Sequence, residues 1–548
     1  MKVGLGVALA TLTDIPFVLK RALAEGNIGG NGKKVLFIWL RGANDGLNSL
    51  IPVNDSSYNN TNRPTTLIRK DSGLDYNSTT GGCDFQLAGV NPPFDPDNDG
   101  NQFAIRLNNG FAALHPSLKF LAPVYNAGDL ALIHRVGYPR QSRSHFDSQN
   151  YWENGAPNNN LITDGIFYRA MLQAIQQNSA INSGLTGVSI QSALPLILRG
   201  SGAAMTNLTD PTRYNLLGIP NDTTAGNTKF DSFLNNANTI PFPSKLDREL
   251  LDLQYKNLST TLQTFAAMDF SEGNGTTTGN FFVDDATTDG DFPYYLFPTT
   301  NLKNGGYDRT KAGTTGTSTA KYVVDTGAYG FFINLKAAAM ILNQTDAIIT
   351  GTEFSGFDTH NSQGGVNGTH ANLMRRLGWA LFSLQKFFTI YGKGGSHALP
   401  GARVGWNDVV VVTLSEFGRT TIENTSLGTD HAEAGVMFVA GGAVQGTGKS
   451  SRTSGVFCCG PSTEIYNGNS VVWNTGQTGT MFGVSSRYLK RAVDYRSILG
   501  EIIRDHMGAT QNQLNAIIPG YAVSGEHLQS GGTSSIDGTA IAGELNLI

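Results

Sequence analysis

The feature of this sequence that most constrains its fold is a set of short, continuous apolar runs. The first, Val35–Leu40, has six apolar residues and ends abruptly in the polar, glycine-containing segment Arg41–Gly46. A run of this length is typical of a strand that is buried on both faces, as in a parallel sheet. Similar runs recur at Leu130–Val136, Ala347–Thr350, Val409–Thr413 and Val436–Ala440.

Helical patterns separate several of these runs. Apolar residues fall on one helical stripe between Leu373 and Phe388, and a second pattern begins at His115-Pro116 and stops at Gly128. Alternation of strands and helices predicts an α/β fold with a doubly wound, mostly parallel sheet. Ligands of such sheets bind at the carboxyl ends of the strands.

The chain of 548 residues is expected to form a single domain over residues 33–521, with long polar insertions near 54–109 and 201–321. Residues 522–548 form a tail rich in Gly, Ser and Thr, and we expect its part from Gly525 to Gly543 to be loosely packed. Residues 1–26 resemble a signal peptide, with Lys2 before the apolar stretches and small residues near their end. The alternative is an N-terminal helix packed on the body.

The amino-acid composition limits the possible cellular location and binding partners of the protein. The net charge of -4, with Lys and Arg scattered, disfavours a nucleic-acid partner, and no segment after residue 26 is apolar enough to span a membrane. Only 15% of residues are charged while glycines number 66, which together with the signal-like segment favours an exported protein, whether periplasmic, cell-surface or extracellular. A homo-oligomer or a larger assembly stays open.

The three cysteines allow two interpretations of their redox state. Because adjacent cysteines bond to each other only with strain, Cys83 is expected to pair with Cys458 or Cys459. Three buried, reduced thiols are the alternative.

Four polar clusters carry the candidate chemistry, and three of them come directly after predicted strands. They are Asn44–Gly46, Ser142–Asp147, Phe357–His360 and the segment from Ser415 to His431. Carboxylates and imidazoles from several strand ends can converge on a divalent metal, and a serine at a helix N-terminus is well placed as a nucleophile. Each cluster also has a structural interpretation: Asp45 as a turn cap, His145 as a first-turn helix residue, Asp358 and His360 as a strand-end hydrogen bond, and Glu416 with Arg419 as an ion pair.

These clusters also carry a family resemblance. From Val35 to about Tyr521 the chain resembles the domain-of-unknown-function family 1501, a relative of alkaline phosphatases and sulfatases, in the strings Leu40–Asn48, Val136–Pro139, Ser142–Phe146, Gly356–His360, Ser415–Arg419, Gly428–His431 and Gly441-Gly442. The resemblance implies an alkaline-phosphatase-like core and export, usually by the twin-arginine route. No twin arginine precedes the apolar stretch here, and Ala432 stands where the family often has Gly. Glu416-Phe417 falls where phosphatases usually show Asp-His, and a phenyl ring cannot bind a metal.

The leading hypothesis is an exported, metal-dependent hydrolase of phosphate or sulfate esters. Its expected metal ligands are Asp45, Asp358, His360, Glu416, Asp430 and His431, and its other catalytic candidates are Ser142 or Ser144 as nucleophile, His145, and Arg143 or Arg419 for the oxyanion. The ion would be Zn, Mn, Mg or Ca. Because Phe417 interrupts the carboxylate half, a transition metal is expected with the histidines, and the carboxylate half is expected to be empty or to hold Mg²⁺ or Ca²⁺. The rival hypothesis is a non-catalytic exported binding or assembly protein that keeps this fold and holds no metal.

Overall fold

The computed structural model describes residues 27–70, 103–177, 183–203, 205–211, 326–460, 463–472 and 487–548, with short stretches between 264 and 324. The signal-like segment 1–26, Cys83 and most of both predicted insertions lie outside the described residues.

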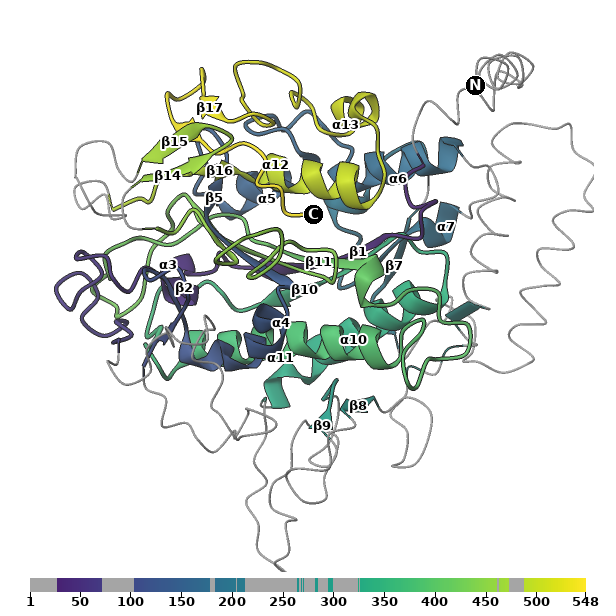
Figure 1. Ribbon diagram of the computed structural model, residues 1–548, viewed down its shortest axis with the longest axis horizontal. Coiled ribbons are helices and arrows are strands. Elements are labelled where there is room, and N and C mark those ends of the chain that lie inside the picture. The colour runs from purple at the N-terminus through teal and green to yellow at the C-terminus, as the bar shows by residue number, and fades with distance from the viewer. Residues whose placement is uncertain are drawn as a thin grey trace, which may run out of the picture.

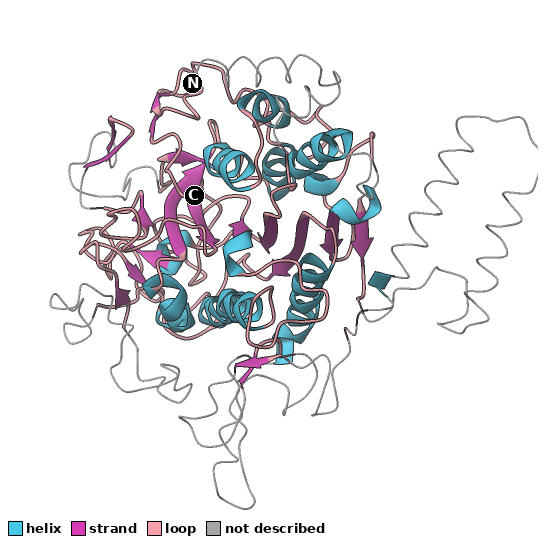
Figure 2. Ribbon diagram, turned by 45° about the vertical axis from the view of Figure 1, so that its right-hand side comes forward, coloured by secondary structure: helices cyan, strands magenta, loops and turns pink. Residues whose placement is uncertain are grey.

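A mostly parallel sheet of nine strands forms the centre of the molecule (Figures 1 and 2). Its order is β13-β5-β12-β11-β1-β10-β6-β7, with β16 also paired to β5. The strands are β1 (Lys34–Arg41), β5 (Leu130–Gly137), β6 (Gly187–Ile190), β7 (Thr206–Leu208), β10 (Ile349–Ser355), β11 (Val409–Leu414), β12 (Gly435–Ala440), β13 (Val456–Phe457) and β16 (Val493–Asp494). The predicted α/β class and large, mostly parallel sheet are therefore confirmed.

One strand departs from the prediction of parallel neighbours. The apolar run Val436–Ala440 does form β12, but β12 is antiparallel to both β11 and β5. A strand buried on both faces has the same apolar pattern in either direction, so the sequence pattern could not fix its orientation. This orientation brings the residues before β12 to the edge where its parallel neighbours end.

Helices cover both faces of the sheet (Figure 1). On one side lie α4 (Ala122–Asn126), α10 (Tyr329–Gln344) and α11 (Thr369–Ile390), and on the other α5 (His145–Asn154), α6 (Ile166–Gln177), α12 (Tyr495–Glu501) and α13 (Gln511–Ile517). Alternate residues of β1 enter the two cores, Leu36 and Ile38 on the first side and Phe37 and Trp39 on the second. Burying each such side chain contributes roughly 1.5–3 kcal/mol, which is why the central strand is apolar throughout.

The two predicted helical patterns both form helices. The stripe from Leu373 to Phe388 lies within α11, and the pattern after His115 forms the 3-10 helix η1 (Pro116–Leu121) followed by α4. Strand β10 begins two residues later than its predicted start and continues to Ser355. The strand can include the buried polar residue Thr352 because the hydroxyl of Thr352 donates to the backbone carbonyl of Ile190 at 2.8 Å. None of the described helices is both long and apolar enough to cross a bilayer.

Shorter elements complete the described chain. The helices among them are α3 (Gly46–Ser49), α7 (Ser183–Thr186), η2 (Leu196–Leu198), η4 (Thr326–Ala328), η5 (Trp406–Asp408) and the π-helix η6 (Ile502–His506). The small sheets pair β2 (Leu50–Ile51) and β3 (Ile105–Arg106) with β4 (Ala113–Leu114), β8 (Phe282–Val283) with β9 (Tyr294–Tyr295), β14 (Thr463–Tyr466) with β15 (Asn469–Val472), and β17 (Gly532–Thr533) with β18 (Ala540–Ile541).

The C-terminal tail is packed on the body, contrary to the expected loose packing. Leu528 and Ile541, within the part from Gly525 to Gly543, are buried. Beyond that part, the Glu501 carboxylate of α12 accepts from the backbone N–H groups of Leu545, Leu547 and Ile548. The polar composition of the tail did not indicate that a few of its apolar residues are buried.

Cys458 and Cys459 are both buried thiols, directly after β13. Because Cys83 lies outside the described residues, the Cys83 disulfide stays a prediction.

Glu501 gives the fold a dependence on pH. Its burial raises its pKa to about 7, against which the three backbone hydrogen bonds act. An acid whose pKa is raised on folding destabilises the folded state as the pH rises from its unfolded pKa to its folded one. Glu501→Gln should therefore remove on the order of 3 kcal/mol of pH-dependent loss between about pH 4.5 and 7. Urea denaturation across this range measures the effect, and parallel curves for variant and wild type would contradict it.

Candidate functional site

The carboxyl ends of parallel strands bring the predicted clusters together at one edge of the sheet. Strands β1, β10 and β11 are mutually parallel, and the segments after them carry Asp45, Asp358 and Glu416 respectively. Helix α5, the first helix after β5, supplies His145 as its first residue. Because β12 is antiparallel, His431, which precedes it, reaches the same edge.

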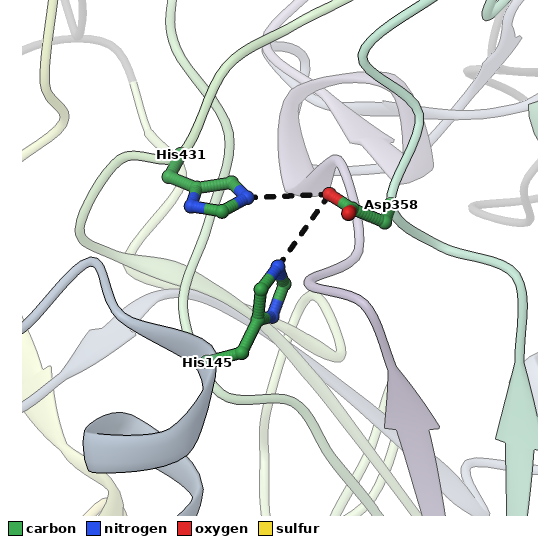
Figure 3. A group of neighbouring side chains, drawn as sticks. All are labelled: His145, Asp358 and His431. Carbon is green, nitrogen blue, oxygen red and sulfur yellow. Dashed lines mark hydrogen bonds and ion pairs between the residues drawn. The ribbon is translucent and has the colours of Figure 1, made fainter.

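The centre of this edge is a group of three imidazoles around one carboxylate. Oδ1 of Asp358 lies 3.1 Å from Nε2 of His360, 3.2 Å from Nε2 of His431 and 3.5 Å from Nε2 of His145. Figure 3 shows His145 and His431 pointing toward Asp358 from two sides. The Nε2 atoms of His360 and His431 are themselves only 2.9 Å apart. We call these four residues the histidine group.

The other nitrogen of each imidazole faces an oxygen acceptor. Nδ1 of His145 lies 2.9 Å from Oε1 of Glu416, and Nδ1 of His360 lies 3.0 Å from Oδ1 of Asp430. Nδ1 of His431 lies 2.9 Å from the backbone carbonyl of Arg143. Because these oxygens can only accept, an Nδ1 that bonds to one of them carries a proton, and in that tautomer of a neutral ring the lone pair of Nε2 points toward Asp358. Such converging lone pairs repel one another unless a cation or proton lies among them.

Local charges shift the pKa values within the histidine group. Burial acts to raise the pKa of Asp358, but the hydrogen bond and charge of Arg419 outweigh it and lower that pKa to about 2. The hydrogen bond that His145 makes to the Glu416 carboxylate raises the pKa of His145. Burial and the charge of Arg419 lower the pKa of His431. The carboxylate is therefore ionised at neutral pH, while the pKa values of His145 and His431 are shifted in opposite directions.

Arg419 forms hydrogen bonds to the loops that follow β1 and β10 and is not placed to bind an oxyanion. Its guanidinium is buried and donates to the backbone carbonyls of Ala43 at 2.8 Å, Thr429 at 3.0 Å, Phe357 at 3.1 Å and Gly42, as well as to Asp358. The predicted oxyanion-binding role is thus replaced by a positioning role for Asp358.

Gly42 allows the close approach of two of these loops. Its φ is 108°, and a Cβ at this position would lie 2.4 Å from the backbone nitrogen of Asp358. A larger residue here would push the Asp358 loop away from β1.

Asp45 is not a member of the histidine group, contrary to the prediction that it binds metal. Its carboxylate is fully buried and accepts from Arg63 at 2.7 Å, from Nε2 of Gln363 at 2.6 Å and from the backbone N–H of Leu47, which it caps at the start of α3. The structural interpretation of Asp45 as a cap therefore fits these contacts, with a buried ion pair in addition.

Glu416 and Asp430 lie behind the histidines and not among the converging atoms. Oε1 of buried Glu416 accepts from the backbone N–H of Gly42 at 2.8 Å and faces His145, while Oδ1 of Asp430 accepts from Nδ2 of Asn424 at 2.8 Å and faces His360. The predicted ligand roles of these two carboxylates are thus replaced by roles in orienting His145 and His360.

Both serines make local contacts. Oγ of Ser144 caps α5 by accepting from the backbone N–H of Asp147, and Oγ of Ser142 accepts from the backbone N–H of Ser144 at 3.2 Å. Among the described residues, no hydrogen bond joins either hydroxyl to the histidine group. Arg143 between them is exposed, and its guanidinium stacks 4.2 Å from the ring centroid of Tyr488.

Phe417 fills the space beside two of the histidines. Its buried ring lies 4.9 Å from the ring of His145 and 4.7 Å from the ring of His431, measured between centroids. Because this apolar ring occupies the position beside the histidines, the histidine group is the one set of converging ligand atoms among the described residues of the site.

Replacing Glu416 with glutamine tests its orienting role. The variant keeps an acceptor for Gly42 and His145 but loses the charge, so the affinity of the histidine group for the transition metal predicted there should fall about 10–100-fold while the fold persists. Competition with a chromophoric chelator measures the affinity. Glu353→Gln, which changes a partly exposed partner of Arg41 in β10, is the matched control. Unchanged affinity would exclude the orienting role, and complete loss of the ion would make Glu416 a ligand.

Comparison with known proteins finds a family match for one segment of the chain. Residues 312–456 match the family model described as "Protein of unknown function (DUF1501)". No curated protein and no solved structure matches the chain. The matched segment includes β10, α11, β11 and β12 and carries His360 and His431, whereas His145 lies outside it. Over this segment the chain is similar to a family whose description assigns no activity.

Proposed function

We propose that this protein is a metal-dependent hydrolase of phosphate or sulfate esters, with one transition-metal ion held by His145, His360 and His431 beside Asp358. The observation that carries the proposal is the convergence of three imidazole Nε2 atoms at Oδ1 of Asp358, with every Nδ1 held by an acceptor. Histidines that bind metals generally have this arrangement, in which a carboxylate or carbonyl fixes the tautomer.

The spacing of the donor atoms fits a zinc-like ion. Two ligands at 2.0–2.1 Å from a tetrahedral ion lie ~3.3 Å from each other. Nε2 of His360 lies 2.9 Å from Nε2 of His431 and 3.1 Å from Oδ1 of Asp358, and Nε2 of His145 lies 3.5 Å from Oδ1 of Asp358, so these pairs lie around that value. The ligand atoms of His145, Asp358 and His431 all lie within 4.8 Å of one another. Three imidazoles favour zinc or a similar transition metal over Mg²⁺ and Ca²⁺, which prefer oxygen ligands.

A single ion with three histidine ligands leaves a position for chemistry. When bound, the ion would supply Lewis-acid activation of water or of an ester oxygen. Asp358, ionised above about pH 2 and held by Arg419, can orient a water or complete the ligand set. Because Ser142 and Ser144 are engaged in local hydrogen bonds, we assign the nucleophile to water rather than to a serine.

The surroundings of the histidine group favour an anionic substrate. His145 is the first residue of α5, so the positive end of the helix dipole lies at the site. Arg143, whose backbone carbonyl faces His431, is exposed, and its guanidinium stacks on the ring of Tyr488. These features support the choice of phosphate or sulfate esters. An alkaline-phosphatase-like arrangement of the core and export through the segment 1–26 belong to the same proposal.

Metal reconstitution followed by an ester screen tests this function. Protein stripped with a chelator would be reloaded with Zn²⁺, Mn²⁺, Mg²⁺ or Ca²⁺ and assayed on p-nitrophenyl phosphate, bis-p-nitrophenyl phosphate and p-nitrophenyl sulfate. We expect hydrolysis with a transition metal, loss of it in His360→Ala, and retention in His397→Ala, which removes an exposed histidine elsewhere. A protein that takes up the ion but cleaves none of these esters would overturn the hydrolase and favour the binding or assembly hypothesis.

A further inference from the structure

A polar cleft of about 380 Å³ lies beside the segments that carry the histidine group. Gln141 lines it, and Nε2 of Gln141 also donates to the backbone carbonyl of Glu416 at 2.9 Å. Ala434, three residues after His431, lines it as well. The cleft and the histidine group therefore share a wall built from the same two segments.

Exposed basic side chains connect the cleft with the histidine group. Arg143 and Arg487 stand by the histidines, since the carbonyl of Arg143 faces His431 and the guanidinium of Arg487 lies 3.6 Å from Asp430. The same two segments of the chain supply Arg140 and Lys490 to the lining of the cleft. We call these four exposed residues, Arg140, Arg143, Arg487 and Lys490, the basic strip.

The acidic residues near the basic strip do not cancel its charge. Asp537 is held by Arg491, whose Nη2 lies 3.0 Å and 3.1 Å from its two oxygens, and Asp430 bonds to His360. Glu433 also lines the cleft, beside the three cations Arg140, Lys490 and Arg491. A locally positive surface thus stands out in a chain whose net charge is -4. Surfaces of this kind concentrate anions and bind them less tightly as salt is added.

We infer that the substrate is a polyanionic ester, with sulfate or phosphate groups repeated along the molecule, that binds the basic strip and enters the cleft. The ester to be cleaved would lie at the histidine group, and the further anionic groups would contact Arg140 and Lys490. The cleavage part of this inference rests on the proposed function. Binding along the basic strip does not require that cleavage occurs.

Direct binding of a defined polyanion tests the inference. The probes are a heparin-derived hexasaccharide, its desulfated counterpart and a linear hexaphosphate, titrated by calorimetry at low and at physiological ionic strength. The variants are the double change Arg140→Gln with Lys490→Gln, and Lys393→Gln, which removes one exposed cation near the amino end of β11. Thermal unfolding curves verify that each variant is folded.

The wild type should bind one of the two polyanions better than the desulfated hexasaccharide, and the preferred polyanion identifies sulfate or phosphate. The double variant should bind that polyanion about 10-fold more weakly, because it removes two exposed charge contacts, and Lys393→Gln should bind as the wild type does. Equal affinity for charged and desulfated probes, or no loss in the double variant, would overturn the inference. Assaying the metal-loaded wild type for hydrolysis of the bound polyanion separates the two proposals: polyanion binding without any ester hydrolysis removes the proposed function alone.

Discussion

Replacing Asp45 with asparagine is expected to lower the free energy of unfolding by about 3–5 kcal/mol, because it leaves the buried guanidinium of Arg63 without its counter-charge. Both side chains are fully buried, 2.7 Å apart, and Arg63 also donates to the backbone carbonyls of Thr420 and Thr421. Burial opposes ionisation of Asp45, but the charge and hydrogen bonds of Arg63 outweigh it and lower the pKa of the carboxyl. The pair therefore fixes the turn after β1 to the loop after β11.

Urea denaturation of the variant beside two comparisons isolates this effect. Asp408→Asn breaks a pair with Lys33 that is about one-third exposed, and its cost should stay below about 1 kcal/mol. The double change Asp45→Asn with Arg63→Met should recover part of the loss, since it removes the uncompensated charge. Asp45→Asn should also keep its metal. A variant that loses metal while its stability is unchanged would show that Asp45 is a ligand.

Replacing His431 or His360 with alanine is expected to reduce transition-metal affinity by more than about 100-fold, beyond the effect of removing a residue that only orients a ligand. Each change deletes one of three converging Nε2 atoms. His145→Ala should have the same effect, although the sequence pattern placed His145 among the catalytic candidates and not among the ligands. Elemental analysis after gel filtration measures the retained ion, with His397→Ala as the control.

The three histidine variants must agree for this interpretation to hold. Since their side chains are each about one-quarter to one-third exposed, the variants should fold without the ion, which thermal unfolding can verify. Full metal retention in any one of the three would remove that residue from the ligand set.

Much of the fold could be predicted because buried strands need continuous apolar runs. Val35–Leu40 and Val409–Thr413 form neighbouring parallel strands, β1 and β11, as expected. The direction of β12 could not be predicted, because burial on both faces imposes the same pattern in either direction. The packing of the part from Gly525 to Gly543 was also missed, since it depends on isolated buried residues such as Leu528.

The location of the candidate site was predictable, and the roles of its carboxylates were not. Position after parallel strands is enough to bring Asp358 and Glu416 to one edge of the sheet. Which carboxylate faces the centre depends on partners that the clusters do not contain: Arg63, which neutralises Asp45, lies within a segment predicted to be an insertion. Likewise His145 joins the histidine group because Glu416 turns its ring, a contact between residues 271 positions apart.

The most direct test of the proposed metal centre is X-ray absorption at the zinc edge of protein reconstituted with one equivalent of Zn²⁺. The arrangement of the histidine group predicts one tightly bound ion per chain, with about three imidazole nitrogens at ~2.0–2.1 Å and one or two oxygens. Loss of the imidazole signal in His431→Ala would tie that ion to this site. No uptake at saturating zinc, or a shell of oxygens alone, would contradict the proposed centre.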